Sequence, residues 1–497
     1  MTRPPLGLIA VVAVLALGTG LGSAVQGSAP KAGDARASVE VVGATVVCPD
    51  LRQTKDLLAT RVSVGSGPLP PGRTSTGGTV EARKISTPGS SIPVPVRSSS
   101  QVAVGLGTTT NKDGLVVAAT GDLSAGLEVE QITRGEDGLD RGLAGLRCTP
   151  PSADIWFAGG STMLGNESVL VLANVDDTPA TLDIDIYSSK GPVDARGGQG
   201  LVIPPHFRDV VRLDTLAPDR DLLGIHVKST RGRVAAGLRH GLKTVTSPGG
   251  IDWVPQTAAP ARQVVVPGFA QGPGLRLLLI TNPGQDDATV KVTVTTRDAQ
   301  FVPVGDDAIT VPAGTTLPVR LDAPALESAL AATVTSDGAP VFAGGLVKDG
   351  QAGSPIGEFS YTGGAQPLSG PALLTDVVID RPTESTLLLT APETDATVVV
   401  TPIQVLGQTG ALPAAKTVKI EGGRTAGLKL STFFPPGTDA KLAVEVRPVS
   451  GSGPVYAARY LRERGAHGPL TTLLVLAGPA QLVSRPAVFV DPQAATP

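Results

Sequence analysis

The sequence predicts an all-β protein of about four tandem immunoglobulin-like β-sandwich repeats, placed after an N-terminal hydrophobic export segment. Two observations predict this fold class. The chain holds 61 Gly and 44 Pro beside Val-, Thr- and Leu-rich runs, which is typical of short strands separated by turns. Two sequence landmarks also recur at intervals of about 110 residues. Because 497 residues are too many for one hydrophobic core, several domains are expected.

The N-terminus carries a targeting signal. Arg3 precedes the uncharged run LGLIAVVAVLALGTGLGSAV over residues 6–25, which is long enough to cross a bilayer core of about 30 Å. Small residues at 27–29 form an imperfect cleavage site, so residues 1–29 are a signal peptide or an uncleaved signal anchor. A linker follows over residues 30–39. Arg3 on the short flank predicts an extracytoplasmic chain, either secreted or held at the cytoplasmic membrane by this one segment.

Three copies of the repeat share two landmarks. Each copy has an apolar strand, a turn and a second strand that opens with an Ala-Thr pair. These pairs begin at Ala180, Ala288 and Ala396, 108 residues apart in both steps. A closing strand then follows, with the sequences RVAAGLRH, PVFAGGLV and PVYAARYL. Because two separate landmarks agree, the sequence predicts a threefold repeat.

A fourth and more divergent copy comes first. GGTVEARKIS at 77–86 is the counterpart of the Ala-Thr strand, and DLSAGLEV at 122–129 resembles the closing strand. The predicted domains are therefore repeat 1 over 40–150, repeat 2 over 151–258, repeat 3 over 259–370 and repeat 4 over 371–492, with a tail at 493–497. Short Pro- and Ala-rich junctions favour a semi-rigid row of domains.

Within a repeat the periodicity is that of β-strands. In TLDIDIY, Leu182, Ile184 and Ile186 alternate with polar residues, so one face of the strand is apolar. A one-faced strand must be covered by another layer, which predicts an antiparallel sandwich of two sheets. LDAPALESAL at 321–330 has roughly helical leucine spacing and predicts a short helical connector.

The chain has two cysteines, Cys48 and Cys148, both on the exported side of the signal. We expect them to form a disulfide near the two ends of repeat 1. Closing a loop of 100 residues stabilises a fold by at most about 4.7 kcal/mol in the chain-entropy model. The alternatives are two unrelated buried thiols and, less favoured, a catalytic or metal-binding pair.

Candidate chemistry is sparse, and we predict no catalytic residue, no cofactor and no metal site. The four histidines are expected to be structural, because none forms a close pair, and the last two are expected in Gly-rich turns: His206, His226, His240 and His467. Asp183 and Asp185 share a strand face, which we interpret as solvated rather than as a glycosidase pair. The turns before the Ala-Thr strands contain Asp176, Asp177, Asp286 and Asp287, which favour local hydrogen bonds to the backbone, with calcium binding as a minor alternative.

Trp156 and Trp253 lie at junctions between repeats and are the candidate interaction residues, although packing between domains is the favoured role. Aromatic residues make up 3% of the chain, which leaves little material for glycan-binding platforms. Charged residues make up 17% and the net charge is -3, so nucleic acid is not an expected partner.

These features together resemble a family of uncharacterised secreted or membrane-anchored actinobacterial proteins, catalogued as a domain of unknown function. The resemblance lies in the export segment, VVGATVVCPD, CTPPSADIWFAGG and LVLANVDDTPATLDIDIYSSKG. It implies a cell-envelope setting and adds no catalytic residue. We therefore expect a non-enzymatic scaffold or protein-binding array whose partner is an envelope protein or glycan. The alternatives are a carbohydrate-binding module for cell-wall or capsular glycan and a hydrolase with an unrecognised site.

Overall fold

The computed structural model describes residues 38–49, 59–69, 74–105, 113–138, 140–243, 248–350, 357–379, 383–434, 441–478 and 482–484. The chain divides into two units, Val41–Gln481 and Met1–Glu40 with Leu482–Pro497. In the smaller unit β1 (Ser38–Glu40) pairs antiparallel with β37 (Leu482–Ser484). The predicted export segment, residues 1–29, lies outside the described residues. No helix in the described ranges is long and apolar enough to cross a membrane.

The larger unit contains four β-sandwiches, each with two antiparallel sheets and its own buried core. In repeat 1 one sheet has the spatial order β2 (Gly43–Cys48), β7 (Leu115–Thr120), β4 (Val80–Lys84), β5 (Ser91–Pro93), and the other β6 (Gln101–Val104), β3 (Ala59–Ser66), β8 (Leu127–Gly135), β9 (Gly142–Arg147). In repeat 2 the first order is β13 (Gly191–Val193), β12 (Ala180–Ser188), β16 (Leu223–Arg231), β10 (Asp154–Ala158), β19 (Gln256–Thr257), with β14 (Leu201–Ile203) also on β12. Its second sheet is β15 (Phe207–Arg212), β11 (Asn166–Asn174), β17 (Ala235–Lys243), β18 (Pro248–Val254).

Repeats 3 and 4 have the same arrangement. Repeat 3 holds β20 (Gln263–Phe269), β26 (Leu330–Ser336), β22 (Ala288–Thr295), β23 (Gln300–Phe301), with β24 (Ile309–Val311) on β22, and β25 (Thr316–Arg320), β21 (Gly274–Thr281), β27 (Phe342–Asp349), β28 (Glu358–Gly363). Repeat 4 holds β29 (Ala372–Val378), β34 (Lys441–Pro448), β31 (Ala396–Ile403), β32 (Lys416–Ile420), and β33 (Arg424–Lys429), β30 (Thr383–Ala391), β35 (Tyr456–Gly465), β36 (Gly468–Val475). Helices are short: η1 (Gly121–Leu123), η2 (Arg196–Gly198), α2 (Leu213–Leu216), α3 (Asp322–Glu327) and α4 (Leu430–Phe433).

The strand order confirms the predicted fold class, including the divergent first copy. In one sheet of each repeat the strand order β2-β7-β4 recurs as β10-β16-β12, β20-β26-β22 and β29-β34-β31. In the other sheet the order β6-β3-β8-β9 recurs as β15-β11-β17-β18, β25-β21-β27-β28 and β33-β30-β35-β36. The Ala-Thr pairs open β12, β22 and β31, and β4 takes the same place in repeat 1. The predicted helical connector at 321–330 contains α3. The sheets of repeat 4 end at Val475, whereas the sequence placed the end of that repeat at 492.

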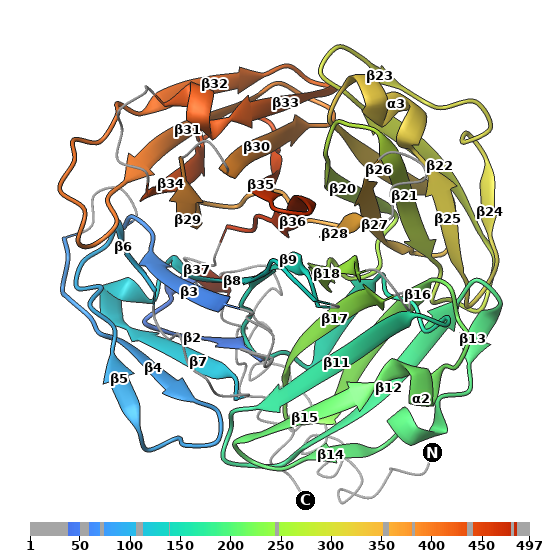
Figure 1. Ribbon diagram of the computed structural model, residues 1–497, viewed down its shortest axis with the longest axis horizontal. Helices are drawn as coiled ribbons and strands as arrows, with labels where there is room; N and C mark the ends of the chain where they lie inside the picture. Colours follow the sequence, from blue (N-terminus) through green and yellow to red (C-terminus); the bar gives the residue numbers. More distant parts are fainter. Residues whose placement is uncertain are drawn as a thin grey trace, which may run out of the picture. The chain divides into compact units, whose positions relative to one another are not determined.

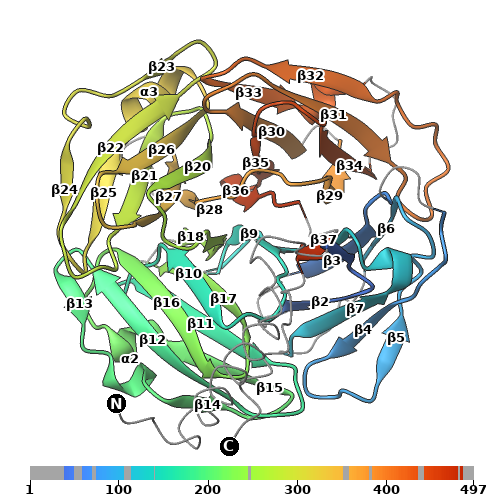
Figure 2. The same cartoon turned by 180° about the vertical axis from the view of Figure 1, so that it is seen from behind.

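The four sandwiches form a closed ring, so the expectation of a semi-rigid row of domains is wrong: the first and last repeats also pack on each other. Within Val41–Gln481 each repeat packs on the next, through β17 on β2, β10 on β27 and β20 on β35, and repeat 4 returns to repeat 1 through β29 on β8. The last strands of the repeats, β9, β18, β28 and β36, pack on one another in a closed cycle. Figures 1 and 2 show these four strands innermost in both views.

One buried carboxylate bonds to all the other repeats at the centre of this cycle. Asp252 on β18 is 0% exposed. Its Oδ1 accepts from the Gly145 backbone N–H of repeat 1 at 3.3 Å and from the Thr472 hydroxyl of repeat 4 at 2.8 Å. Its Oδ2 accepts from the Tyr361 backbone N–H of repeat 3 at 3.0 Å. Glu358 of repeat 3, also buried, lies nearby, with Oε2 3.4 Å from Arg141 Nη1 of repeat 1.

Ion pairs concentrate at the seam between repeats 1 and 4, where no covalent connection joins neighbouring repeats. Among the described residues, three arginine–carboxylate pairs cross it: Arg61–Asp376, Arg134–Glu463 and Arg459–Glu130. Both members of the last pair have side chains 1% exposed, and Glu130 Oε2 also accepts from the Thr375 hydroxyl at 2.8 Å. Removing one partner of such a buried pair is strongly destabilising, because the other charge is left unpaired.

A disulfide joins Cys48 and Cys148, as expected from the sequence, with their Cα atoms 4.7 Å apart. Cys48 ends β2 in one sheet, and Cys148 follows β9 in the other. The bond therefore ties the two sheets of repeat 1 together, at the ends of β2 and of the central strand β9.

We predict that Asp252→Asn lowers the free energy of unfolding by about 1–3 kcal/mol, and Asp252→Ala by about 3–5 kcal/mol. The amide keeps one acceptor oxygen and turns an N–H₂ group toward buried donors, whereas alanine removes every acceptor. Urea denaturation followed by circular dichroism measures both changes. Asp298→Asn, at an exposed acid, is the control, with an expected change within about 0.5 kcal/mol. Equal stability of Asp252→Asn and the wild type would contradict the structural role of Asp252.

We predict that Cys48→Ala/Cys148→Ala loses about 2–5 kcal/mol, because the unfolded chain regains the freedom of a loop of 100 residues. Denaturation midpoints with and without a thiol reductant measure the effect. Reductant should bring the wild type to the midpoint of the variant and leave the variant unchanged. A wild type that is insensitive to full reduction would count against this account.

Candidate functional site

Two surface clefts and one axial pocket lie between the repeats of the larger unit. The tyrosine cleft, between repeats 2 and 3, has a volume of about 370 Å³ and is lined by residues 185–187, 192–193, 283–285 and 313–314. The charged cleft, between repeats 3 and 4, has a volume of about 860 Å³ and is lined by residues 270–273, 329, 349–350, 384, 386, 388, 427, 429, 460, 462 and 467–469. The axial pocket, of about 260 Å³, lies where the four central strands end, so every repeat contributes to its lining.

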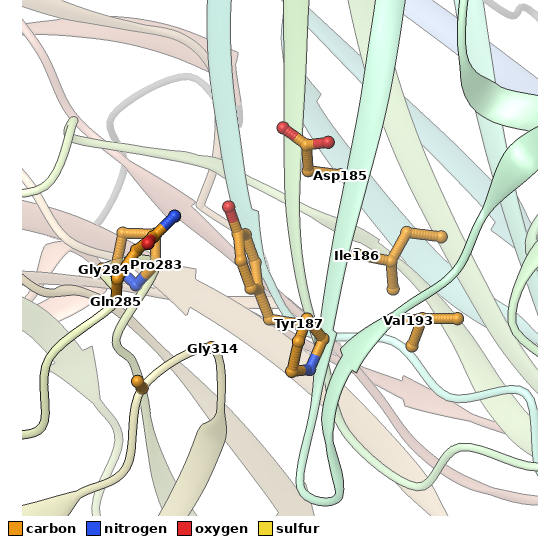
Figure 3. Close-up of a pocket in the computed structure, with 10 residues that line it drawn as sticks. Asp185, Ile186, Tyr187, Val193, Pro283, Gly284, Gln285 and Gly314 are labelled. Atoms are coloured by element: carbon orange, nitrogen blue, oxygen red, sulfur yellow. The ribbon is translucent and has the colours of Figure 1, made fainter.

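The alternation of β12 positions the polar side of the tyrosine cleft. Leu182, Ile184 and Ile186 are buried in the core of repeat 2, so Asp185 and Tyr187 lie on the opposite face of the strand. Figure 3 shows the Tyr187 ring beside Asp185, with Pro283 and Gln285 across the cleft.

Repeat 3 supplies the facing wall through two fixed turns. Asn282 at the end of β21 is 0% exposed, and its side-chain N–H₂ donates to the Asp286 and Val311 carbonyl oxygens at 2.8 and 3.0 Å. Its Oδ1 accepts from the Gly284 N–H at 2.9 Å, which holds the turn at 283–285. Gly314 has a φ of +67°, and a Cβ there would lie 2.8 Å from Pro192 Cδ. Glycine therefore permits the close approach of the two repeats at this cleft.

Asp185 belongs to a polar cluster on the outer face of repeat 2. Its Oδ2 lies 3.6 Å from His226 Nδ1, and His226 Nε2 lies 2.7 Å from Asp154 Oδ1. Hydrogen bonding by His226 holds the pKa of Asp185 below its usual value, so this carboxyl group is ionised at neutral pH. Burial raises the pKa of Tyr187 to about 12, so its phenol stays protonated.

The two tryptophans pack at junctions between repeats. Trp156 is 9% exposed and stacks on His226, with ring centroids 3.6 Å apart, and it also contacts Phe342 of repeat 3 with centroids 5.0 Å apart. Trp253 is 2% exposed and lies in a cluster between repeats 1 and 2, which includes Ala144 and Leu146 of β9. Burial leaves these side chains without an open aromatic face.

Charged side chains of repeat 4 line one wall of the charged cleft. Lys429 and Glu384 form an ion pair at 3.1 Å, and Arg462 stands opposite Glu384 in the β30–β35 register. At the wall formed by repeat 3, Asp349 Oδ1 accepts from Arg276 Nη2 at 2.7 Å, and its Oδ2 accepts from the Tyr460 hydroxyl. Lys429 and Arg462 are exposed, so the repeat 4 wall presents two cations around Glu384, while Asp349 on the facing wall is paired with Arg276.

The histidines are dispersed, and His240 is placed differently from the expectation. It lies within β17 and is 6% exposed, whereas the sequence placed it in a Gly-rich turn. Its Nδ1 lies 2.6 Å from the Tyr361 hydroxyl and its Nε2 2.9 Å from Asn166 Oδ1. Since Asn166 Oδ1 can only accept, Nε2 carries the proton and the tyrosine donates to Nδ1. Burial lowers the pKa of His240 to about 3, so the ring is neutral.

The other acids named in the sequence analysis lie apart from one another, and each has a different partner. Asp183 accepts from the Gly200 N–H at 2.7 Å, Asp176 pairs with Arg233, and Asp287 accepts from the Ala313 N–H at 2.9 Å. Among the described residues, no group of three or more His, Cys, Asp or Glu side chains is arranged to hold a metal ion.

Sequence reasoning missed the central residues Asp252 and Tyr361. The sequence signal for Asp252 is a single charged residue in the otherwise apolar run IDWV, whereas Tyr361 contributes its backbone N–H, which carries no sequence signal. In the register of the closing strands, Asp252 pairs with His240, Ser360 with Val347, and Thr472 with Leu461. A polar residue thus occupies the equivalent central position in three copies.

The fold and its clefts define a class of protein, a closed ring of four β-sandwich repeats with open clefts at the junctions. The chain belongs to DUF5719, a family of unknown function, whose model matches residues 96–431. The expected membership in a family of unknown function is thereby confirmed. The matched span includes all of repeats 2 and 3 and both walls of the tyrosine cleft. No curated protein and no solved structure matches the chain.

We predict that His240 makes the ring less stable in acid. Its folded pKa of about 3 lies below the unfolded value of about 6.5, so the unfolded state binds more protons between these values. Stability is therefore lost as pH falls below 6.5, by about 2 kcal/mol between pH 7 and pH 5. Urea denaturation of the wild type and His240→Gln at both pH values measures this contribution, which the variant should lack. Identical pH dependence of the two proteins would contradict the assignment.

Proposed function

We propose that the protein is a non-enzymatic extracytoplasmic cell-envelope protein that acts as a scaffold, holding another envelope component. It would be secreted or anchored to the cytoplasmic membrane by its N-terminal segment. The hydrophobic run at 6–25 supports export, and the Cys48–Cys148 disulfide fits an oxidising compartment. The resemblance to secreted actinobacterial proteins agrees with this setting.

The observation that carries the scaffold proposal is the closure of the four repeats into one ring. Asp252 bonds to three other repeats, and buried ion pairs join the last repeat to the first. A support of this kind holds its surface clefts in fixed positions, which suits recognition because little ordering is needed on binding. The charged cleft, with a volume of about 860 Å³, is the larger of the two and is the site we propose for an envelope protein.

The ionisable groups favour binding over hydrolysis. A glycosidase needs two carboxyl groups about 5–9.5 Å apart across a substrate, one of them with a raised pKa. Burial raises the pKa of both Asp252 and Glu358, but these side chains are 0% and 1% exposed at the centre of the ring. In the clefts, Asp349 and Glu384 are bonded to basic side chains, and the pKa of Asp185 is lowered.

Glycan binding is the second candidate function, and one observation favours it. The partly exposed Tyr187 ring lies in a cleft beside Asp185, which combines an aromatic face with a hydrogen-bonding group.

Site-specific photo-crosslinking in exporting cells tests the scaffold proposal. A photoreactive residue placed at Lys429, in the charged cleft, should give one discrete protein adduct. The same residue at Lys419, exposed on β32 in the other sheet of repeat 4, is the matched control, and we expect at least fivefold less of that adduct.

Arg462→Ala should also reduce the adduct formed at position 429 without changing the amount of exported protein, because it removes a cation from the cleft wall. Equal adducts at positions 429 and 419, or no adduct at either, would overturn the charged cleft as the partner site.

A further inference from the structure

We propose that the tyrosine cleft is a binding site for a neutral saccharide. This inference rests on the proposed binding function and names the ligand class for a different cleft. Two features carry it, the mixture of ring faces and hydrogen-bonding groups in the cleft, and the way both walls are fixed by buried contacts.

The side chains of the cleft match the two surfaces of a pyranose ring. Its C–H face packs on aromatic and proline rings, here Tyr187, Pro192 and Pro283. Its hydroxyl groups need planar acceptors and donors at the edge of that face. Asp185 offers two acceptor oxygens, and Gln285 offers both an acceptor and a donor pair.

The Tyr187 hydroxyl completes the set. It stays protonated, so it can both donate and accept, and it makes no hydrogen bond with another described residue. The strand behind it is attached to repeat 3, because the Thr316 hydroxyl lies 3.4 Å from the Tyr187 carbonyl oxygen and Ser188 forms a β-bridge with Thr315. The ring therefore enters the cleft from a fixed backbone.

The other groups are held as firmly. Asp185 is positioned by His226 and by the Gln199 side-chain amide, which donates to its Oδ1 at 3.4 Å. His226 is itself fixed by stacking on Trp156. Across the cleft, the hydrogen bonds of Asn282 hold the turn that carries Pro283 and Gln285. A saccharide can bind such a preorganised cleft at little conformational cost.

Charge selects the type of saccharide. Among the described residues, Asp185 is the one carboxyl group lining the cleft, and no lysine or arginine lines it. An acidic polymer would therefore meet a negative charge with no cation to pair with, whereas the hydroxyl groups of a neutral sugar can donate to the carboxylate. The volume of about 370 Å³ is in the usual range for small-ligand sites.

Polysaccharide retention tests the proposal. Full-length protein, purified from the medium or from detergent-solubilised membranes, is passed over immobilised α-glucan, β-glucan, mannan, galactan and the acidic polymer hyaluronan. We expect retention by at least one neutral polymer and none by hyaluronan. The dissociation constant for the retained polymer is then measured for the wild type and for the variants.

Tyr187→Ala should weaken binding at least tenfold, because the stacking face is lost. Tyr187→Phe keeps that face, so it should lose no more than about threefold. Asp185→Asn should lose three- to tenfold, because one acceptor becomes a donor. Tyr456→Ala, at a partly exposed tyrosine of repeat 4 outside both clefts, should bind like the wild type. Thermal midpoints of all variants show whether the ring stays folded.

Three results would overturn the saccharide site: no retention by any neutral polymer, equal binding by the wild type and Tyr187→Ala, or retention by hyaluronan alone. The scaffold proposal fails separately. Loss of saccharide binding with an intact adduct at position 429 rejects this inference only, whereas the reverse outcome rejects the protein partner and leaves the saccharide site standing.

Discussion

The ring depends on the hydrogen bonds that one buried carboxylate accepts from three other repeats. Asp252 reaches Gly145, Tyr361 and Thr472 with only two oxygen atoms. Burial raises the pKa of Asp252 and opposes its charge, while these donors favour it. A side chain that satisfies donors from separate repeats fixes their spacing, because moving any repeat leaves a buried N–H or O–H unpaired. The packing of four apolar cores alone would not set that register.

The seam between repeats 1 and 4 is built differently because of chain connectivity. Neighbouring repeats elsewhere are joined by short covalent connections, which keep the surfaces close in the unfolded chain. Repeats 1 and 4 are separated by the whole length of the ring, so their contact must overcome a larger loop-closure entropy. The arginine–carboxylate pairs at this seam fix the relative position of repeats 1 and 4 as well as attracting them. If the two repeats packed in another position, Glu130 and Arg459 would be buried without a partner. The disulfide then strengthens repeat 1, the partner that closes the ring.

The repeat, the sandwich and the disulfide could be predicted from the sequence, because each follows from a local residue pattern or from the composition. The Ala-Thr pairs recur since Ala180, Ala288 and Ala396 open the same strand and are buried in the same way. Closure of the ring is not local. It depends on Asp252, which bonds to Tyr361 and Thr472 of other repeats. The residues at the register position of Asp252 in repeats 3 and 4 are Ser360 and Thr472, so the position leaves no repeating motif.

The tyrosine cleft was hidden for a related reason. Tyr187 and Gln285 are nearly 100 residues apart, and each alone resembles an ordinary surface residue. The low aromatic content argues against an extended aromatic platform, whereas the proposed saccharide site needs a single ring with a facing wall from a second repeat. For His240 the local sequence was misleading. Its Gly-rich surroundings indicated a turn, but His240 lies within β17, and the neighbouring glycines allow close packing around the central strands. Gly237, for example, lies against Trp253, where a Cβ would be 2.9 Å from the indole ring.

Placing the clefts between repeats couples binding to ring closure. A ligand that contacts both walls of a cleft binds the closed ring and not the separated repeats, so it stabilises the closed form by an amount set by its concentration relative to its dissociation constant. For the tyrosine cleft the walls are joined by Thr316, Trp156 and Phe342, and a ligand there adds to contacts that already exist. The junction between repeats 2 and 3 thus contributes both to the stability of the ring and to the proposed ligand site. This shared role of the junction accounts for the arrangement of the cleft. Buried side chains hold its walls, whereas the groups that a ligand could contact lie near strand ends and in turns.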